Sequence, residues 1–302
     1  MNANTLAITG VTGKSGAVFA KNLAAHADEV HTMFPGGVRL LLHRRSADGL
    51  LGAVAPVEEM YGELADEAFL RKALAGVDTL VHISGIDLSE RIMRVAAESG
   101  VRRAILVHTT GIYSKYKAAG ENYRRIDAAV TALCKEHGIA LTILRPTMIY
   151  GTVSDQNVVK FIKMVDRLPV MPVVNDARYA LQPVHYADLG DAYYAVLTHE
   201  AAANHNSNLS GGEEILLRDM LSEIGRQLGK NVKFFSVPFP IAYAGAWGVY
   251  LLTLGRADYR EKVQRLCEPR VYPHDEATRD FGYAPRRFAE GVADEIKEYK
   301  AL

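Results

Sequence analysis

The sequence predicts an α/β fold in which helices cover both faces of a doubly wound parallel sheet. Short apolar runs alternate with amphipathic stretches through the first half of the chain, at the spacing of strand–helix–strand units. Most of these runs lack polar alternation, which is typical of strands buried on both faces. The predicted strands cover residues 6–9, 38–43, 56–61, 79–83, 104–108 and 140–144. The predicted helices cover residues 15–27, 66–75, 89–99 and 120–137.

The strand–helix alternation loosens after Gly151, where Pro169, Pro172 and Pro183 interrupt it. We therefore predict a sheet domain over residues 1–151, whose core continues into parts of the C-terminal half. Residues 152–302 are expected to form a smaller, less regular portion. That portion should lie over the carboxyl ends of the strands, where ligands bind in open α/β sheets.

The composition of the chain narrows the class of protein. Basic and acidic residues number 35 each among 302, so the chain lacks the positive charge expected of a nucleic-acid-binding protein. Cys134 and Cys267 are far apart with no CxxC spacing, which argues against a disulfide framework or a zinc site, and we predict no metal. No basic, apolar leader precedes the first predicted strand, so we expect a cytoplasmic protein.

One segment, residues 234–255, carries no charged side chain over 22 positions. Its length alone would allow a membrane span. Pro238 and Pro240 interrupt its start, however, and leave a predicted helix of roughly fifteen residues from Ile241. We favour a buried or pocket-lining helix, so membrane contact is not expected. An interfacial membrane contact and a lid for an apolar substrate remain alternatives.

Three glycines, Gly10, Gly13 and Gly16, follow the first predicted strand and open the first predicted helix. The first would let the chain turn, the second would let the backbone approach a pyrophosphate, and the third would let the helix pack closely on the sheet. The helix N-terminus then offers unpaired N–H groups to the anion. We predict a dinucleotide site whose loop also contains Thr12, Lys14 and Ser15.

Six motifs, in order along nearly the whole chain, resemble the extended branch of the short-chain dehydrogenase/reductase superfamily, the NAD-dependent epimerase/dehydratase-like proteins. They are GVTGKSG, GELADEAFLRKALAGVDTLVHISG, LTILRPTMIYG, LQPVHYADLGDAYYAVL, LSGGEEILLRDMLSEIGRQLG and RDFGYAPRRFAEGV. The resemblance implies a Rossmann-like domain with a small substrate domain. It also implies a nicotinamide cofactor and a carbinol or ketone substrate, with a nucleotide sugar as one candidate.

The end of the second predicted strand indicates which cofactor binds. Arg44 and Arg45 stand there in place of the acidic residue that would bind a ribose 2′-hydroxyl, and arginine suits a 2′-phosphate. We therefore predict NADP(H) rather than NAD(H). By resemblance, further cofactor contacts come from Glu63 with its neighbour Leu64, from Ile83, Ser84 and Gly85, and from Tyr123, Pro146 and Thr147.

The catalytic residues implied by the resemblance are incomplete. The family uses a hydroxyl, which Thr110 matches, and a tyrosine followed four residues later by a lysine. At the tyrosine and lysine positions stand Ala119 and Tyr123, and Asp127 occupies a position where the family often has glutamate. Tyr113, Tyr116 and Lys117 form a nearby YxxxK string. Either this string replaces the missing pair, with Thr110, Tyr113 and Lys117 as catalytic residues, or the chain binds the dinucleotide without the usual chemistry.

These observations lead to a cytoplasmic NADP(H)-dependent oxidoreductase or epimerase/dehydratase-like enzyme, with a non-catalytic NADP(H)-sensing or assembly protein as the alternative. A small-molecule substrate and a homodimer are compatible with the resemblance. His185 is predicted to be structural, with Asp188 capping the helix that follows. Substrate candidates by location are Gln156, Asn157 and Lys160, and Arg178, Arg256 and Arg270 are scattered candidates for an anionic substrate group.

Overall fold

The computed structural model describes residues 4–52, 54, 56–116 and 118–302. A seven-stranded sheet organises the first half of the chain, in the order β11-β6-β5-β4-β1-β2-β3. Every neighbouring pair is parallel. Its strands are β1 (Leu6–Thr9), β2 (Val38–Leu42), β3 (Val57–Tyr61), β4 (Thr79–His82), β5 (Arg103–Val107), β6 (Ala140–Pro146) and β11 (Asn206–Leu209). This confirms the predicted fold class.

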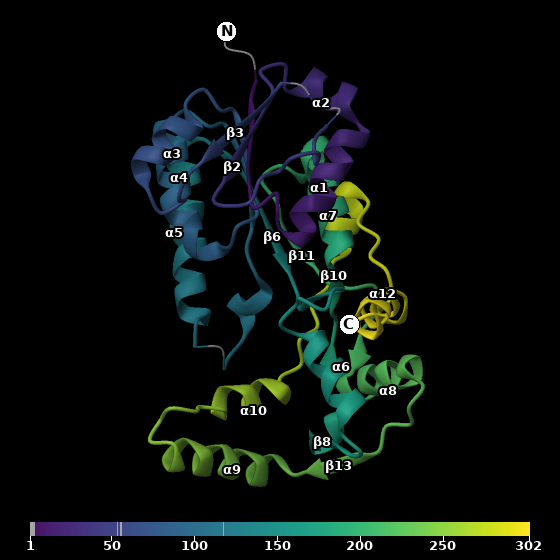
Figure 1. Cartoon of the computed structure of the whole chain (residues 1–302). Coiled ribbons are helices and arrows are strands. Elements are labelled where there is room, and N and C mark those ends of the chain that lie inside the picture. Colours follow the sequence, from purple (N-terminus) through teal and green to yellow (C-terminus); the bar gives the residue numbers. More distant parts are fainter. Residues whose placement is uncertain (1–3, 53, 55, 117) are drawn as a thin grey trace.

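Helices cover both faces of this sheet, as Figure 1 shows. One face packs on α3 (Glu67–Leu74), α4 (Ser89–Glu98) and α5 (Gly120–His137). The other packs on α1 (Lys14–Ala25), α2 (Ala27–Met33), α7 (Tyr186–Thr198) and α11 (Asp275–Phe281). Short 3₁₀ turns are η1 (Ile86–Leu88), η2 (Thr110–Tyr113), η3 (Asn175–Ala177) and η4 (Glu200–Ala202). The sequence did not predict α2, a short helix that directly follows α1.

The C-terminal half contributes to the sheet domain as well as forming a lobe of its own. Strand β11 extends the sheet beyond β6, and α7 packs closely against α1. The close approach needs Gly190, because a Cβ there would lie 2.7 Å from the Ser15 carbonyl oxygen and 2.4 Å from Val18 Cβ. Phe19 and Tyr193 pack edge to face across the same contact, with ring centroids 6.2 Å apart. The two halves of the chain therefore share one core.

The lobe at the carboxyl ends of the strands has a separate core around Ile162, Met220, Ile224 and Phe288. Its helices are α6 (Val158–Arg167), α8 (Leu217–Leu228) and α12 (Phe288–Lys300). Three two-stranded pairs complete it: β7 (Ile149–Tyr150) with β10 (Val184–His185), β9 (Ala180–Leu181) with β12 (Ile215–Leu216), and β8 (Met171–Val174) with β13 (Phe234–Val237).

From this lobe extends an arm, residues 239–266, formed by α9 (Phe239–Leu252) and α10 (Arg260–Leu266). Figure 1 shows the arm running away from the lobe and passing below α5. Helix α9 begins at Phe239, earlier than predicted, because a proline is tolerated in a first helical turn, where its missing N–H has no partner to lose.

The expectation that this apolar segment is buried or lines a pocket is wrong. Among the residues of α9 only Ala246 is buried, while the side chains of Ile241 and Leu251 are each 63% exposed and that of Leu252 is 87% exposed. The helix contacts mainly α10, so most of its apolar surface has no neighbour within the described part of the chain. No helix among the described residues is both long enough and apolar enough to span a bilayer.

Candidate functional site

The glycine loop between β1 and α1 has the close backbone approach that a bound dinucleotide requires. Gly10 has φ +77°, a conformation that glycine adopts without strain. A Cβ on Gly16 would lie 2.2 Å from the Gly10 carbonyl oxygen, so only glycine fits there. No side chain caps α1, which leaves the amides of its first turn available to an anion.

The turn after β4 closes the other side of this loop. A Cβ on Gly10 would lie 3.0 Å from both the amide nitrogen and the Oγ of Ser84, so these predicted residues do come together. His82 fixes the turn: its Nδ1 lies 2.7 Å from Thr9 Oγ1 and its Nε2 lies 3.0 Å from the Gly85 carbonyl oxygen. Complete burial lowers the pKa of His82 to about 4, so the ring is neutral.

A neutral His82 ring satisfies both bonds at once, because one nitrogen donates to the Gly85 carbonyl while the other accepts from the Thr9 hydroxyl. Thr9 Oγ1 also accepts from the amide of Ile83 at 3.3 Å. Thr9 and His82 belong to no motif that is recognisable in the sequence, so their role could not be predicted from it. Their contribution depends on β1 and β4 being neighbours in the sheet.

The adenosine side of the site lies after β2 and β3. Arg44 and Arg45 are exposed there and form no ion pair with any described residue. Glu63, predicted to face the adenine, pairs instead with His43, with Oε1 and Nε2 3.4 Å apart and both side chains more than half exposed. Leu64 packs partly buried against the core beneath α3, α4 and α5. The glycine loop and these exposed cations therefore lie on the side of the sheet where a dinucleotide is expected.

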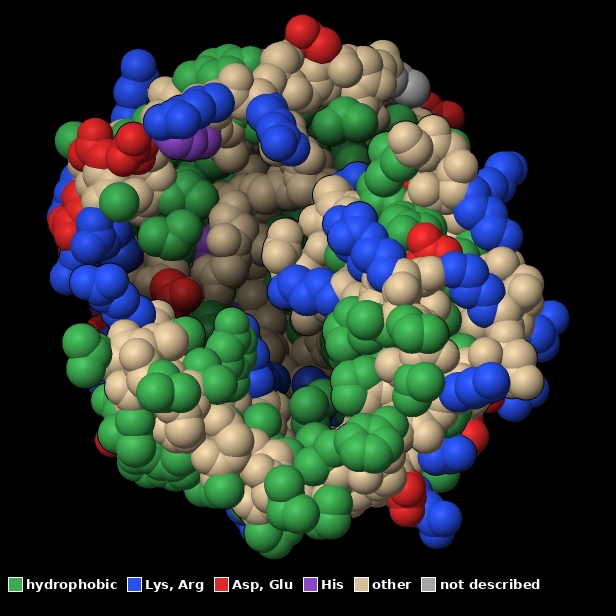
Figure 2. Space-filling model, turned by 60° about the horizontal axis from the view of Figure 1, so that its bottom comes forward, with side chains coloured by type: hydrophobic (Ala, Val, Ile, Leu, Met, Phe, Trp, Pro, Cys, Tyr) green, Lys and Arg blue, Asp and Glu red, His purple; other side chains and the backbone are tan. Residues whose placement is uncertain are grey.

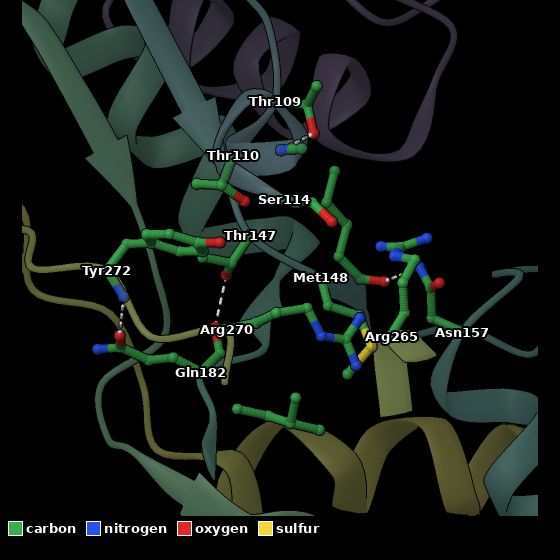
Figure 3. A pocket seen from close by; sticks show the side chains of 13 residues that line it. Thr109, Thr110, Ser114, Thr147, Met148, Asn157, Gln182, Arg265, Arg270 and Tyr272 are labelled. Carbon is green, nitrogen blue, oxygen red and sulfur yellow. Dashed lines mark hydrogen bonds between the residues drawn. The ribbon is translucent and has the colours of Figure 1, made fainter. Parts of the chain in front are cut away.

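A cavity of about 290 Å³ lies at the carboxyl ends of β5 and β6. Figure 3 shows it from close by, and Figure 2 shows the deep hollow that opens on the face where the arm comes forward. The cavity is lined by Thr109, Thr110, Gly111, Ser114, Thr147, Met148, Ile149, Asn157, Leu181, Gln182, Arg265, Arg270 and Tyr272. It therefore lies where ligands bind in open α/β sheets.

Two hydroxyl groups predicted from the sequence meet in this cavity. Thr110 Oγ1 donates to the Pro146 carbonyl oxygen at 3.1 Å, and Thr147 Oγ1 donates to the Gln182 carbonyl oxygen. Tyr272, which the sequence analysis did not single out, points its ring toward both threonines (Figure 3). The Tyr272 backbone is fixed by a bond from its amide to Gln182 Oε1, at 3.1 Å.

Burial and the nearby charge of Glu268 raise the pKa of Tyr272, although Arg270 and Arg265 act in the opposite direction. The phenol is therefore protonated at neutral pH and can donate a proton. No local signal in the sequence could have identified Tyr272, because it reaches the cavity only through the fold of residues 267–274.

Arg265 and Arg270 also face the cavity. The Nε atoms of both guanidinium groups are buried and have no hydrogen-bond partner among the described residues. Burial and the neighbouring charge of Arg265 lower the pKa of Arg270. Two cations so close together with unused donors favour an anionic group in the cavity. Of the scattered arginines proposed from the sequence, Arg270 lines the cavity, whereas Arg178 and Arg256 do not.

A buried ion network lies behind the cavity floor. Asp127 Oδ1 is 2.7 Å from His108 Nδ1 and its Oδ2 is 2.6 Å from Arg145. Burial alone would raise the pKa of Asp127, but the bonds and charges of His108 and Arg145 outweigh it and lower that pKa. His108 Nε2 lies 3.1 Å from Ser89 Oγ. The network ties α4 and α5 to the strand ends that hold Thr109 and Thr110.

The two tyrosines of the YxxxK string do not line the cavity. The Tyr113 hydroxyl donates to Asn208 Oδ1 at 3.3 Å, and its ring stacks on Tyr272 with centroids 5.2 Å apart. Tyr113 is 46% exposed and Tyr116 is 44% exposed, and neither side chain lines the cavity. Lys117 lies outside the described residues. Tyr123, on α5, packs partly buried against the core on this face of the sheet, and burial raises its pKa.

The remaining residues predicted to contact substrate are only partly found at the cavity. Asn157 lines the cavity, while Gln156 and Lys160 are exposed outside its lining. His185 is structural as predicted, since its Nδ1 accepts from the Ala187 amide at 3.3 Å and burial lowers its pKa to about 4. It is therefore His185, not Asp188, that caps α7.

Asp188 has a different role from the predicted cap. It accepts from the Arg286 side chain at 2.8 Å and from the Arg286 amide at 3.1 Å. The N-cap is the residue that precedes the first helical residue. Because α7 begins at Tyr186, that residue is His185, and Asp188 already lies inside the first turn.

No protein-family model matches the chain. It is 22% identical over 276 residues to a 2-alkyl-3-oxoalkanoate reductase of Stenotrophomonas maltophilia, covering 77% of this chain and 83% of that protein. It is 26% identical over 228 residues to a (4-alkanoyl-5-oxo-2,5-dihydrofuran-3-yl)methyl phosphate reductase of Streptomyces griseus, covering 74% and 75% of the two chains.

Two solved structures resemble the whole chain. The crystal structure of gox2253 gives a TM-score of 0.76 at 20% identity, covering 99% of this chain and 98% of that one. The dTDP-glucose 4,6-dehydratase DesIV of Streptomyces venezuelae, solved with NAD bound, gives 0.69 at 18% identity, covering 98% and 97%. The chain has the fold of the extended short-chain dehydrogenases/reductases. The chain is distantly similar in sequence to reductases. This similarity, together with the fold, favours an oxidoreductase or an epimerase-like enzyme.

Proposed function

We propose that this extended short-chain dehydrogenase/reductase fold carries an NADP(H)-dependent oxidoreductase that interconverts a ketone and a carbinol on a small molecule bearing a carboxylate or phosphate. The pair Arg265 and Arg270 carries this proposal, because both residues line the cavity and each has a buried Nε without a hydrogen-bond partner among the described residues, although Arg265 also lies 3.8 Å from Glu261. Both reductases to which the chain is similar have names that describe an anionic substrate, a carboxylate in one and a phosphate in the other.

The cofactor is proposed to lie with its pyrophosphate on the Gly10–Gly16 loop, including Thr12, Gly13, Lys14 and Ser15, and against Ile83, Ser84 and Gly85. Arg44 and Arg45 would bind the 2′-phosphate, since both are exposed and unpaired within the described part of the chain. When bound, NADPH supplies a hydride to the carbonyl carbon. Pro146 and Thr147 border the expected nicotinamide end.

The carbonyl oxygen must take up a proton as the hydride arrives at carbon. Thr110 is proposed to hold this oxygen, since its hydroxyl can rotate from the Pro146 carbonyl to a substrate. Tyr272 is proposed to give the proton from its phenol, and its raised pKa keeps that proton in place until the oxygen becomes basic. The Tyr113–Lys117 alternative is less well supported, because the Tyr113 hydroxyl is bound to Asn208 outside the cavity.

Steady-state NADPH oxidation with matched substrates tests the proposal. A 3-oxoacid, a keto phosphate and a nucleotide sugar are compared with the neutral ester of the same 3-oxoacid. Arg270→Met should raise the KM for the preferred anionic substrate by roughly tenfold to hundredfold, with little change for the ester. Arg178→Met, a control 76% exposed and outside the cavity, should change neither. Equal turnover of acid and ester by the unmodified protein would contradict the anionic substrate.

A non-catalytic NADP(H)-responsive protein is the second candidate. It is favoured by Ala119 and Tyr123, which occupy the positions of the usual tyrosine and lysine. Ala119 immediately precedes α5 and has no side chain that could transfer a proton. Saturable NADPH binding without turnover of any carbonyl compound in the panel, together with a shift in protease sensitivity, would favour this candidate.

A further inference from the structure

The arm presents a large apolar surface that the proposed reaction does not use. Segment 234–255 has no charged residue, and the exposed apolar side chains in and beside α9 are Phe235, Ile241, Trp247, Val249, Leu251, Leu252 and Leu254. Leu252 and Leu254 are 87% and 89% exposed. Scattered exposed leucines need no explanation, but a continuous group on one helix marks an interaction surface.

Basic side chains border this surface at both ends. Lys233 precedes the uncharged segment and Arg256 follows it; both are exposed and neither forms an ion pair with a described residue. Lys262, on α10, lies over the Tyr259 ring at 4.9 Å. In Figure 2, hydrophobic side chains gather over the lower part of the view with Lys and Arg side chains beside them.

Two aromatic rings of α9 contact Arg260, a cation of α10 that also pairs with Asp258. The Arg260 guanidinium stacks over Trp247 at 4.2 Å and over Tyr250 at 3.9 Å. Tryptophan and tyrosine next to cations are typical of the level at which a protein meets lipid headgroups. The arrangement of apolar residues, rings and cations matches the layers of a bilayer surface.

The width of the apolar surface favours a bilayer over a second copy of the chain. At 3.6 residues per turn, Ile241, Trp247, Val249, Leu251 and Leu252 spread over roughly 200° of the helix circumference. A helix packed on another protein usually buries a narrower stripe and keeps a polar face, whereas α9 has no charged residue on any face.

We propose that α9 is an in-plane docking element for an anionic bilayer surface, with its apolar side chains among the acyl chains and Lys233, Arg256 and Lys262 at the headgroups. Helix α10, which packs on α9, carries Arg265 into the cavity. Docking would therefore place the cavity next to the membrane. The docking itself does not depend on the reaction proposed above.

The chain contains one tryptophan, Trp247, which reports on docking directly. Vesicles of phosphatidylcholine alone and vesicles with about 30% phosphatidylglycerol are added to the full chain. The Trp247 side chain is 40% exposed, so transfer to lipid should shift its emission to shorter wavelength and reduce quenching by acrylamide. Binding should favour the anionic vesicles and weaken as salt rises from about 0.05 M to about 0.5 M.

Two variants separate the apolar and electrostatic contributions. Leu252→Asp should reduce the vesicle partition coefficient by roughly tenfold or more, while Leu302→Asp, an 87% exposed leucine outside the arm, should not change it. The double variant Lys233→Gln with Arg256→Gln keeps the apolar surface intact and should lose the preference for anionic vesicles. Unchanged thermal melting of each variant shows that the fold is retained.

The proposal is overturned if the emission of Trp247 does not move with either vesicle. It is also overturned if the shift occurs without lipid and grows with protein concentration, because a second copy then covers α9. Sedimentation velocity of the unmodified chain and of Leu252→Asp identifies that outcome.

Discussion

Gly10 and Gly16 lie against backbone atoms of neighbouring turns, whereas every residue of α9 except Ala246 is at least partly exposed to solvent. The glycine loop between β1 and α1 is held in place by the neighbouring strand β4 and by the buried hydrogen bonds of His82. Just beyond the arm, Glu268 accepts from Ser114 Oγ at 2.6 Å and from the Lys115 amide at 2.8 Å, and at its start the Phe239 amide donates to Asn175 Oδ1 at 2.9 Å. The cofactor side is therefore rigid by packing, and the substrate side depends on a few polar contacts.

This difference has a functional meaning. A pyrophosphate is the same in every reaction of the fold, so its binding loop gains from tight packing. Substrates vary, and a wall formed by residues 265–272 can change its side chains without disturbing the sheet. The following experiments test whether the two sides behave in these different ways.

The largest effect is expected at Tyr272. Tyr272→Phe removes the proposed proton donor and should lower kcat by roughly 10²–10⁴-fold, with little change in NADPH affinity. Tyr113→Phe is the matched control, because its ring stacks on Tyr272 but its hydroxyl lies outside the cavity. The control should remain within about threefold of the unmodified enzyme. The reverse ranking would support the Tyr113–Lys117 hypothesis. Single-turnover kinetics provide the measurement.

In the glycine loop, Gly16→Val should reduce NADPH affinity by roughly hundredfold and lower the midpoint temperature of thermal unfolding. The new Cβ would lie 2.2 Å from the Gly10 carbonyl oxygen, and the backbone cannot move without displacing α1. Gly52→Ala is the control, because its Cβ would meet only the Gly49 carbonyl oxygen at 3.9 Å. Calorimetric titration measures both. If Gly16→Val bound NADPH as tightly as the unmodified protein, the glycine loop would not be rigid.

Cofactor choice should be a smaller effect on the same side. Replacing Arg44 and Arg45 with alanine removes two charge-assisted contacts to a 2′-phosphate and should weaken NADPH binding by roughly tenfold to hundredfold. NADH binding by the same variant serves as the internal control and should stay unchanged. If the unmodified protein binds NADH more tightly than NADPH, the interpretation of these arginines is wrong.

The remaining prediction concerns stability and involves Glu295, a fully buried carboxyl that accepts from the Gly151 amide at 3.0 Å. Burial and the nearby charge of Asp155 raise the pKa of Glu295 from 4.5 to about 9. The folded state therefore holds this proton more tightly than the unfolded state does. Its contribution to stability is complete below pH 4.5 and is lost as the pH rises toward 9.

Glu295→Gln keeps a neutral side chain of the same shape and should flatten this pH dependence, by no more than about 1.4 kcal/mol per pH unit. Urea unfolding of both proteins between pH 5 and about 9 measures the free energy of unfolding. Parallel curves for the two proteins would contradict the raised pKa.

The sequence alone determined the parallel sheet and its glycine loop, because hydrophobic periodicity and the spacing of Gly10, Gly13 and Gly16 are local properties of the chain. Helix α5 has the predicted bounds, whereas the pairing of β1 with β4 is seen only in the structure. The tertiary structure alone decided that α9 is exposed, because an apolar run has the same composition whether it is buried or not. It also decided that Tyr272, Arg265 and Arg270 meet Thr110, since these residues are brought together by a long-range path of the chain that no local pattern encodes.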